Sequence, residues 1–140
     1  MAKDYVLDTS AFLCYIQGEE GSGVVEKILH AAKRKESRIY ISFMTLMELY
    51  YILWQEKGEA IAKETVVLVE ALPVERIESN PRLGLLAGRI KATQRLSVAD
   101  AFIAATAIEK KAILVHKDPE LAVLGELTQT LELPYKNKKA

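Results

Sequence analysis

The feature that most constrains the fold of this chain is a regular alternation between short apolar runs and longer stretches of helical periodicity. The short runs predict strands at 5–7, 38–42, 74–77, 112–116 and near 131–133. The helical spacing predicts helices at 10–16, 24–32, 45–56, 59–72, 81–91 and 98–110. Strands separated by helices favour an α/β fold, in which helices cover both faces of a mainly parallel sheet.

Two neighbouring segments support this fold class. The segment 98–110 is rich in alanine and has almost no polar face in its middle, so we expect a buried helix packed closely on the sheet. The run 112–116 is continuously apolar, as is typical of strands inside parallel sheets. Ligands bind at the carboxyl ends of such strands, so the residues that follow each strand are the candidates for a site.

The composition limits the class of protein. A chain of 140 residues suits one domain spanning 1–140, in which we expect residues 136–140 to form a basic tail. A net charge of zero argues against a globally basic nucleic-acid coat protein. The single cysteine, Cys14, excludes an internal disulfide and a cysteine-rich zinc site. With no apolar run long enough to span a membrane, a reducing cytoplasm is expected.

Four acidic residues follow or open the predicted elements: Asp8, Glu48, Asp100 and Asp118. Each has a local explanation, because Asp8 and Asp118 suit helix N-caps. Glu48 follows Thr45 with capping-box spacing, and Asp100 follows Ser97 in the same way.

A shared site is the alternative explanation for the four acids. A parallel sheet would gather them at one edge, where carboxylates repel one another unless a proton or a cation intervenes. Oxygen ligands without a His or Cys cluster favour Mg²⁺ or Mn²⁺. The N-termini of nearby helices could hold phosphate oxygens. These parts suit metal-assisted hydrolysis of a phosphodiester.

The same segments resemble a known family. Residues 6–11 read VLDTSA, 45–49 read TLMEL, 96–107 read LSVADAFIAATA, and 116–118 read HKD. In this order they resemble the PIN-domain ribonucleases, and most closely the VapC-type toxins of prokaryotic toxin–antitoxin pairs. The resemblance extends from residue 5 to about residue 133. It implies a three-layer α/β/α sandwich and a metal-dependent endoribonuclease.

The resemblance also implies roles for individual residues. Asp8, Glu48, Asp100 and Asp118 would be catalytic and would bind one or two Mg²⁺ or Mn²⁺ ions. Ser10 would hydrogen-bond the first acid or the substrate, whereas we expect Thr9 to face the backbone as a local cap.

One position departs from the family pattern. His116 stands where members usually carry Thr or Ser, and it could donate a hydrogen bond, bind a phosphate or simply end the strand. Two basic clusters could hold an RNA backbone. Of these, the cluster with Arg89 and Arg95 is favoured over the one at 33–38, because it precedes the Asp100 helix.

The predicted helix 45–56 carries more large apolar residues than one core-facing stripe needs. Tyr50, Tyr51 and Trp54 therefore indicate either core packing or a protein interface, such as a homodimer surface or a groove for a small antitoxin protein. We expect Phe12, Tyr15 and Ile16 to complete that groove.

Three other functions are alternatives to the ribonuclease. A signalling receiver domain needs an acidic pair at its first strand and an Asp on its third, and this chain has neither. A haloacid-type phosphatase needs a second Asp at the position of Ser10. A PIN-like module that binds RNA or protein without cleavage is the remaining alternative.

Overall fold

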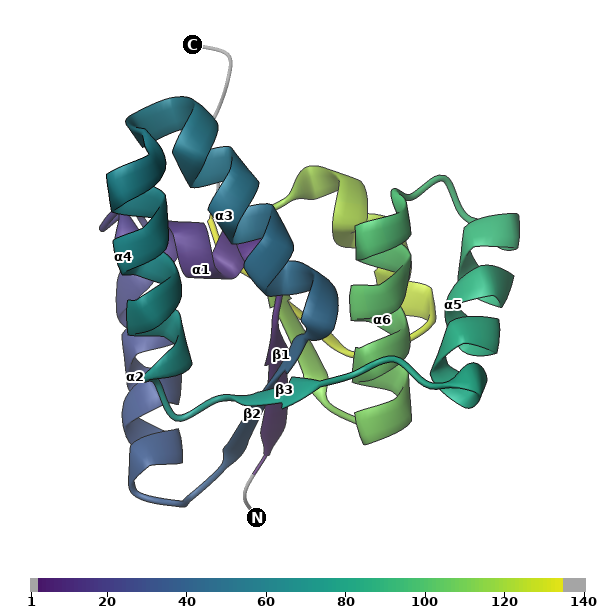
Figure 1. Cartoon of the computed structure of the whole chain (residues 1–140). Coiled ribbons are helices and arrows are strands. Elements are labelled where there is room, and N and C mark those ends of the chain that lie inside the picture. The colour runs from purple at the N-terminus through teal and green to yellow at the C-terminus, as the bar shows by residue number, and fades with distance from the viewer. Residues whose placement is uncertain (1–2, 135–140) are drawn as a thin grey trace, which may run out of the picture.

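A five-stranded sheet lies between two layers of helices in the computed structural model, which describes residues 3–134 (Figure 1). The predicted basic tail at 136–140 lies outside the described residues. The strands are β1 Asp4–Leu7, β2 Arg38–Ser42, β3 Glu75–Ile77, β4 Ile113–His116 and β5 Thr130–Glu132. The helices are α1 Thr9–Ile16, α2 Ser22–Lys33, α3 Phe43–Lys57, α4 Glu59–Glu70, α5 Pro81–Thr93, α6 Val98–Lys110 and the 3₁₀ helix η1 Pro119–Glu126.

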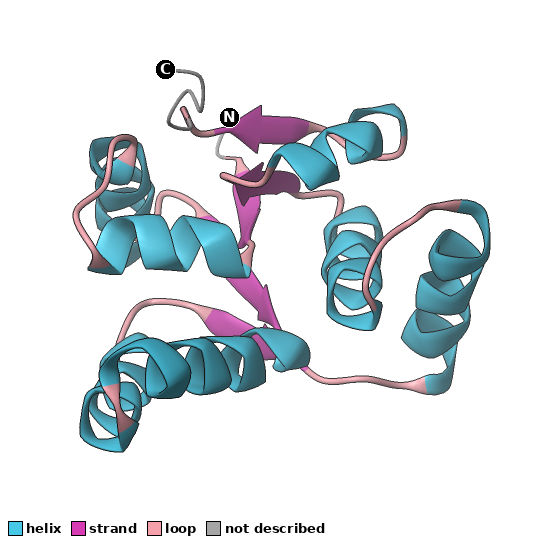
Figure 2. Ribbon diagram, turned by 90° about the horizontal axis from the view of Figure 1, so that it is seen from above, coloured by secondary structure: helices cyan, strands magenta, loops and turns pink. Residues whose placement is uncertain are grey.

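The strand order is β3-β2-β1-β4-β5, and every pairing is parallel. This confirms the predicted three-layer α/β/α sandwich. Because successive side chains of a strand point to opposite faces, each strand serves two cores. Val6 and Leu114 pack with α5, α6 and η1, whereas Leu7 and Val115 pack with α1 to α4. Figure 2 shows these two groups of helices on either side of the sheet.

The alanine-rich helix α6 packs directly on the sheet, as its composition predicts. Its alanines are fully or almost fully buried beside Val6 and Leu114. The hydroxyl of Ser97 caps the helix by accepting a hydrogen bond from the backbone N–H of Asp100 at 3.1 Å. The helix ends at Lys110, and the next residue, Lys111, follows it in a left-handed conformation with φ 53°. The cap therefore fixes where the acidic first turn of α6 begins.

Two helix starts differ from the sequence-based expectation. α3 begins at Phe43 because the hydroxyl of Ser42 accepts a hydrogen bond from the backbone N–H of Met44 at 3.1 Å. α2 begins at Ser22, directly after Gly21 with φ +101°. A Cβ at Gly21 would lie 3.3 Å from the Cβ of Leu133, so glycine suits both the backbone and the space.

Across residues 3–134, no helix combines the length and apolarity that a membrane crossing requires.

Candidate metal centre

The four predicted acids come from elements that meet at one edge of the sheet. Asp8 directly follows β1, and Asp118 lies two residues beyond β4. Glu48 lies on α3, which follows β2, and Asp100 lies in the first turn of α6. β1, β2 and β4 are adjacent and parallel, so their carboxyl ends share an edge. The topology therefore collects residues that are far apart in the sequence.

The carboxyl groups influence one another electrostatically. Burial raises the pKa of Asp8 from 3.8 to about 6, and the charges of Glu48 and Asp118 add to the rise. The pKa of Asp100 also rises to about 6, first through burial and then through the charges of Asp8 and Asp118. Burial, with repulsion from Asp100 and Asp118, raises the pKa of Glu48. The four acids therefore lie within electrostatic reach of one another, and Asp8, Glu48 and Asp100 resist simultaneous ionisation.

Asp8 is held by Ser10. Its Oδ2 atom accepts hydrogen bonds from the backbone N–H of Ser10 at 2.9 Å and from the Ser10 hydroxyl at 2.5 Å. Asp8 is thus the N-cap of α1 as well as a member of the acidic group. The local and the shared explanations both apply to this residue. Its fixed orientation comes from the first turn of the helix that it caps.

Thr9 and Glu48 form a contact that differs from the sequence-based expectation. The Thr9 hydroxyl donates a 2.6 Å hydrogen bond to Oε1 of Glu48 across 39 residues of sequence. The predicted local backbone cap at Thr9 is therefore wrong. The predicted capping box at Thr45 is also wrong, because Ser42 caps α3 and Glu48 interacts with α1 instead. No local pattern could reveal this pair, since it depends on the packing of α1 against α3.

His116 lies beneath the acidic edge. Its imidazole is buried, and its Nδ1 accepts a hydrogen bond from the backbone N–H of Asp118 at 3.2 Å. Burial lowers the pKa of His116, which favours the neutral ring that can accept this bond. Asp118 in turn caps η1 by accepting from the backbone N–H of Glu120 at 3.0 Å. His116 thus ends strand β4 and supports the turn that carries Asp118, and the residue is only 1% exposed.

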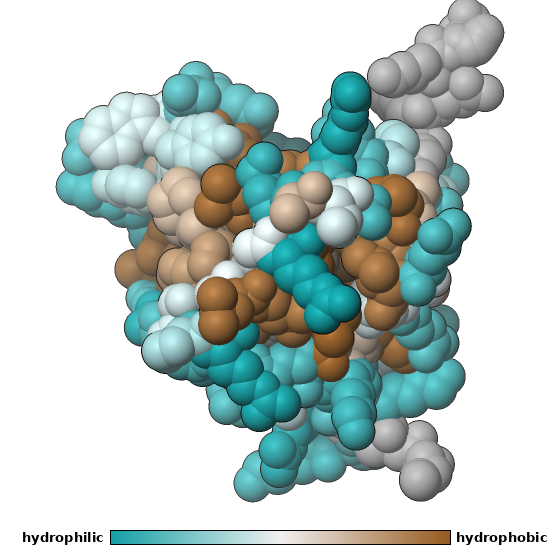
Figure 3. Space-filling view, turned by 90° about the vertical axis from the view of Figure 1, so that its right-hand side faces the viewer, coloured by the Kyte–Doolittle hydropathy of each residue, from teal (hydrophilic) through white to brown (hydrophobic). Residues whose placement is uncertain are grey.

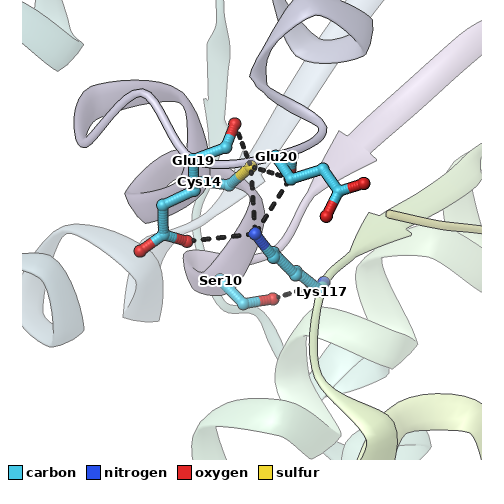
Figure 4. Close-up of polar contacts among 5 residues, drawn as sticks. All are labelled: Ser10, Cys14, Glu19, Glu20 and Lys117. Carbon is cyan, nitrogen blue, oxygen red and sulfur yellow. Dashed lines mark hydrogen bonds and ion pairs between the residues drawn. The ribbon is translucent and has the colours of Figure 1, made fainter. Parts of the chain in front are cut away.

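Lys117 is a residue of this region that the sequence reasoning missed. Its backbone N–H donates to the Ser10 hydroxyl oxygen at 2.8 Å. Its ammonium group reaches the loop between α1 and α2, where it contacts Glu19 and Glu20 (Figure 4). The only sequence signal was its place between His116 and Asp118, which does not reveal the direction of its side chain.

The two basic clusters lie at different places in the fold. Arg89 lies on α5 and Arg95 lies in the loop that leads to the cap of α6, and both side chains are exposed. Arg95 precedes Ser97 by two residues, so this cluster adjoins the helix that carries Asp100. The cluster at 33–38 lies between the end of α2 and the start of β2, at the amino edge of the sheet. The fold therefore separates that second cluster from the acids.

The donor chemistry of the acidic edge fits a hard divalent cation. Its ligands are carboxylates, which suit Mg²⁺ or Mn²⁺. Burial and the charges of neighbouring carboxylates raise the pKa values of Asp8 and Asp100, and a bound cation would offset this by favouring their ionised forms. Across the described part of the chain, however, no three Asp, Glu, His or Cys side chains are already grouped as a metal-binding cluster. A cation would therefore draw the carboxylates further inward.

Helix α3 has an apolar surface in addition to its buried side. Met47, Tyr51 and Trp54 are 50%, 44% and 44% exposed and recur at helical spacing. Ordinary core packing therefore does not account for them. On the neighbouring helix α1, Phe12 is completely buried, so the expectation that it completes an open groove is wrong.

Comparisons with known proteins agree with this architecture. The VapBC2 structure from Rickettsia felis, bound to promoter DNA, aligns with a TM-score of 0.73 at 18% identity, covering 94% of this chain and 99% of that one. The Mycobacterium tuberculosis toxin VapC20, described as cleaving the sarcin–ricin loop, aligns with a TM-score of 0.68 at 17% identity, covering 86% and 95%. VapBC-1 from Haemophilus influenzae aligns with a TM-score of 0.67 at 19% identity, covering 92% and 97%.

At these identities the structural likeness establishes the fold. None of the curated proteins matches the chain significantly in sequence. The family model described as PIN domain matches residues 5–127, which include all four acids of the edge. The chain therefore belongs to the PIN-domain family.

Proposed function

We propose that this protein is a Mg²⁺- or Mn²⁺-dependent endoribonuclease of the VapC type, which hydrolyses phosphodiester bonds in RNA. The observation that carries the proposal is the group of four carboxyls at one sheet edge, where burial and neighbouring negative charge raise the pKa values of Asp8, Glu48 and Asp100. Buried repulsion of this kind destabilises a fold unless a bound cation offsets it. The structural likeness to a toxin described as cleaving the sarcin–ricin loop supports RNA as the substrate class.

The residues of the acidic edge would have two roles, which are to bind the cation and to orient its ligands. Asp8, Glu48, Asp100 and Asp118 would hold the cation. When bound, it supplies Lewis acidity that polarises the phosphodiester and favours deprotonation of the attacking water. Ser10 and Thr9 orient two of the carboxylates through the hydrogen bonds described above.

Other side chains would bind parts of the RNA away from the bond that is cleaved. The exposed guanidinium groups of Arg89 and Arg95 would contact the RNA backbone, because phosphate contacts position a nucleic acid without reading its sequence. His116 acts from below the site, through the backbone N–H of Asp118.

A small antitoxin protein is the proposed partner. Structurally similar proteins include a toxin–antitoxin complex from Klebsiella pneumoniae and VapBC-5 from Mycobacterium tuberculosis, described as a member of a family of toxin–antitoxin systems. On this chain the exposed apolar side chains of α3 offer a surface for a partner segment, and α4 adds further ones. The exposed apolar residues of the two helices are Met47, Tyr51, Trp54, Ile61, Val67 and Leu68.

A homodimer is also proposed, through the opposite side of the molecule. Figure 3 shows the face on the α5 side, where apolar surface is interrupted by hydrophilic residues. Leu85 on α5 is 78% exposed and Val98 at the start of α6 is 53% exposed. The mass of the purified protein in solution tests this assembly. We place the protein in the cytoplasm, where its RNA substrate would be found.

The deciding experiment is cleavage of total cellular RNA by the purified protein. Reactions contain Mg²⁺, Mn²⁺ or EDTA, and Asp100→Asn serves as the control for contaminating nucleases. Discrete new RNA ends that depend on the metal and vanish with the variant support the proposal. RNA binding without cuts under any condition would instead favour the PIN-like binding module.

A further inference from the structure

The side chain of Lys117 ties the acidic edge to the loop between α1 and α2 (Figure 4). Its Nζ donates to the carbonyl oxygen of Glu20 at 2.9 Å and to Oε1 of Glu19 at 3.2 Å. The side chain is only 13% exposed, and the Sγ of buried Cys14 lies 3.9 Å from the ammonium. A charge this well covered needs such partners, because desolvating it alone is costly.

The backbone of the same residue reaches the site. The N–H of Lys117 donates to the Ser10 hydroxyl oxygen at 2.8 Å, and that hydroxyl donates to Oδ2 of Asp8. One residue therefore joins three segments that are distant in sequence: the end of β4, the first turn of α1 and the loop at 17–21. Movement of that loop would reach Asp8 through three successive hydrogen bonds, from Glu20 to Lys117, from Lys117 to Ser10 and from Ser10 to Asp8.

A direct role in holding RNA is less consistent with this geometry. A lysine that binds a phosphate needs free donors and an exposed ammonium, whereas this one is mostly covered and bonded within the protein. The connection to the acidic edge is therefore mechanical.

We propose that Lys117 is a positioning residue, which anchors the 17–21 loop and thereby fixes Ser10 and Asp8 in the orientation that receives the cation. This proposal rests on the proposed metal-dependent function of the edge. Mutating a residue that orients a metal ligand commonly lowers metal affinity or activity by about 10–100-fold. Lys117 would be such a residue, because it bonds Ser10, which in turn bonds Asp8.

The test compares three variants in the full chain. Lys117→Met keeps the length of the side chain and removes its charge and donors. Glu19→Gln removes the negative charge that pairs with Lys117 and so weakens the same anchor. Because this variant keeps Lys117, it still tests the anchor if Lys117→Met fails to fold. Lys63→Met is the matched control, because it removes a 2.8 Å ion pair to Glu59 on α4, a helix that carries none of the acids.

The following measurements distinguish a loss of positioning at the acidic edge from a general destabilisation of the fold. Titration calorimetry with Mn²⁺ should show about 10-fold weaker binding for Lys117→Met, a smaller loss for Glu19→Gln and none for Lys63→Met. Hydrogen exchange on the metal-free protein should show faster exchange at the Lys117 amide and at 17–21 in the first two variants only. In cleavage assays, kcat should fall while the KM for RNA stays unchanged.

Unchanged Mn²⁺ affinity or unchanged exchange in Lys117→Met would overturn the positioning role. If the wild-type protein cleaves no RNA, the proposed activity fails, but the exchange comparison still decides whether Lys117 holds Ser10 and Asp8. If neither Lys117→Met nor Glu19→Gln alters exchange while the wild-type enzyme cleaves RNA, the activity stands and the anchor does not.

Discussion

The charge of Asp100 opposes stability, and the proposed role of this residue requires that same charge. Its pKa is raised by burial and by the neighbouring charges of Asp8 and Asp118, so its carboxylate is unfavourable at neutral pH without a cation. Asp100→Asn should therefore raise the melting temperature of the metal-free protein at pH 7.5. The rate of RNA cleavage should fall by more than ~100-fold, which is the upper range for mutating a residue that only supports a metal ligand. Full cleavage by the variant would remove Asp100 from the proposed catalytic set.

Thr9 gives a second test at the residue scale. Thr9→Val keeps the shape but removes the hydroxyl that hydrogen-bonds Glu48, a bond that lowers the raised pKa of Glu48. We expect a roughly 10-fold loss of kcat and an acidic limb of the pH–rate profile that moves to higher pH. Thr9→Ser should restore both values. An unchanged profile in Thr9→Val would show that the bond does not tune Glu48.

At the scale of elements, α6 depends on small side chains. Ala104 is fully buried in the core that α6 shares with the sheet. Ala104→Leu should lower the free energy of unfolding by about 1–3 kcal/mol, because extra volume in a packed core forces shifts. Urea denaturation measures the loss. The matched exposed change, Ala92→Leu on α5, should stay within about 0.5 kcal/mol of the wild type.

The exposed side of α3 predicts a different outcome. Tyr51 and Trp54 contribute little to the core, so changing both to Ser should leave the melting temperature nearly unchanged. The same double variant should weaken binding of a co-purified antitoxin by at least ~10-fold, since aromatic residues often dominate interfaces. Calorimetric titration with the partner measures this. Equal affinity for both proteins would exclude this face as the antitoxin surface.

Element boundaries were predictable where the local sequence contains the signal. The segments 38–42 and 98–110 match β2 and α6 because apolar runs and a capping serine mark their ends. The start of α3 was misplaced because Ser42 acts both as the last residue of β2 and as the cap of the next helix. A residue with two structural roles gives no clear boundary in the sequence.

For the whole molecule, the pH dependence of stability has a definite sign. Asp8 has a pKa near 3.8 when unfolded and about 6 when folded, so between these values the folded protein binds more protons. Stability of the metal-free protein is therefore highest below pH 4 as far as this group is concerned, and it is lost as the pH rises through 6. The rise at Asp8 corresponds to about 3 kcal/mol.

Urea denaturation of the metal-free protein between pH 4.5 and 7.5 should show this decline. Adding Mg²⁺ or Mn²⁺ at pH 7.5 should restore part of the lost stability through binding to the folded state. Below pH 5 the cation should have little effect, because Asp8 and Asp100 are then protonated. A flat profile with no metal effect would show that the acidic edge is not electrostatically strained.

The sequence by itself determined the alternation of strands and helices and the burial of α6, because periodicity and capping act over a few residues. The motifs that resemble the PIN-domain family singled out the four acids. Only the tertiary structure decided which acids share an edge, that Thr9 bonds Glu48, that His116 lies beneath Asp118, and that Lys117 joins Ser10 to the 17–21 loop. These contacts join residues up to 107 positions apart. Their formation depends on how helices pack against a parallel sheet, and no local pattern encodes that geometry.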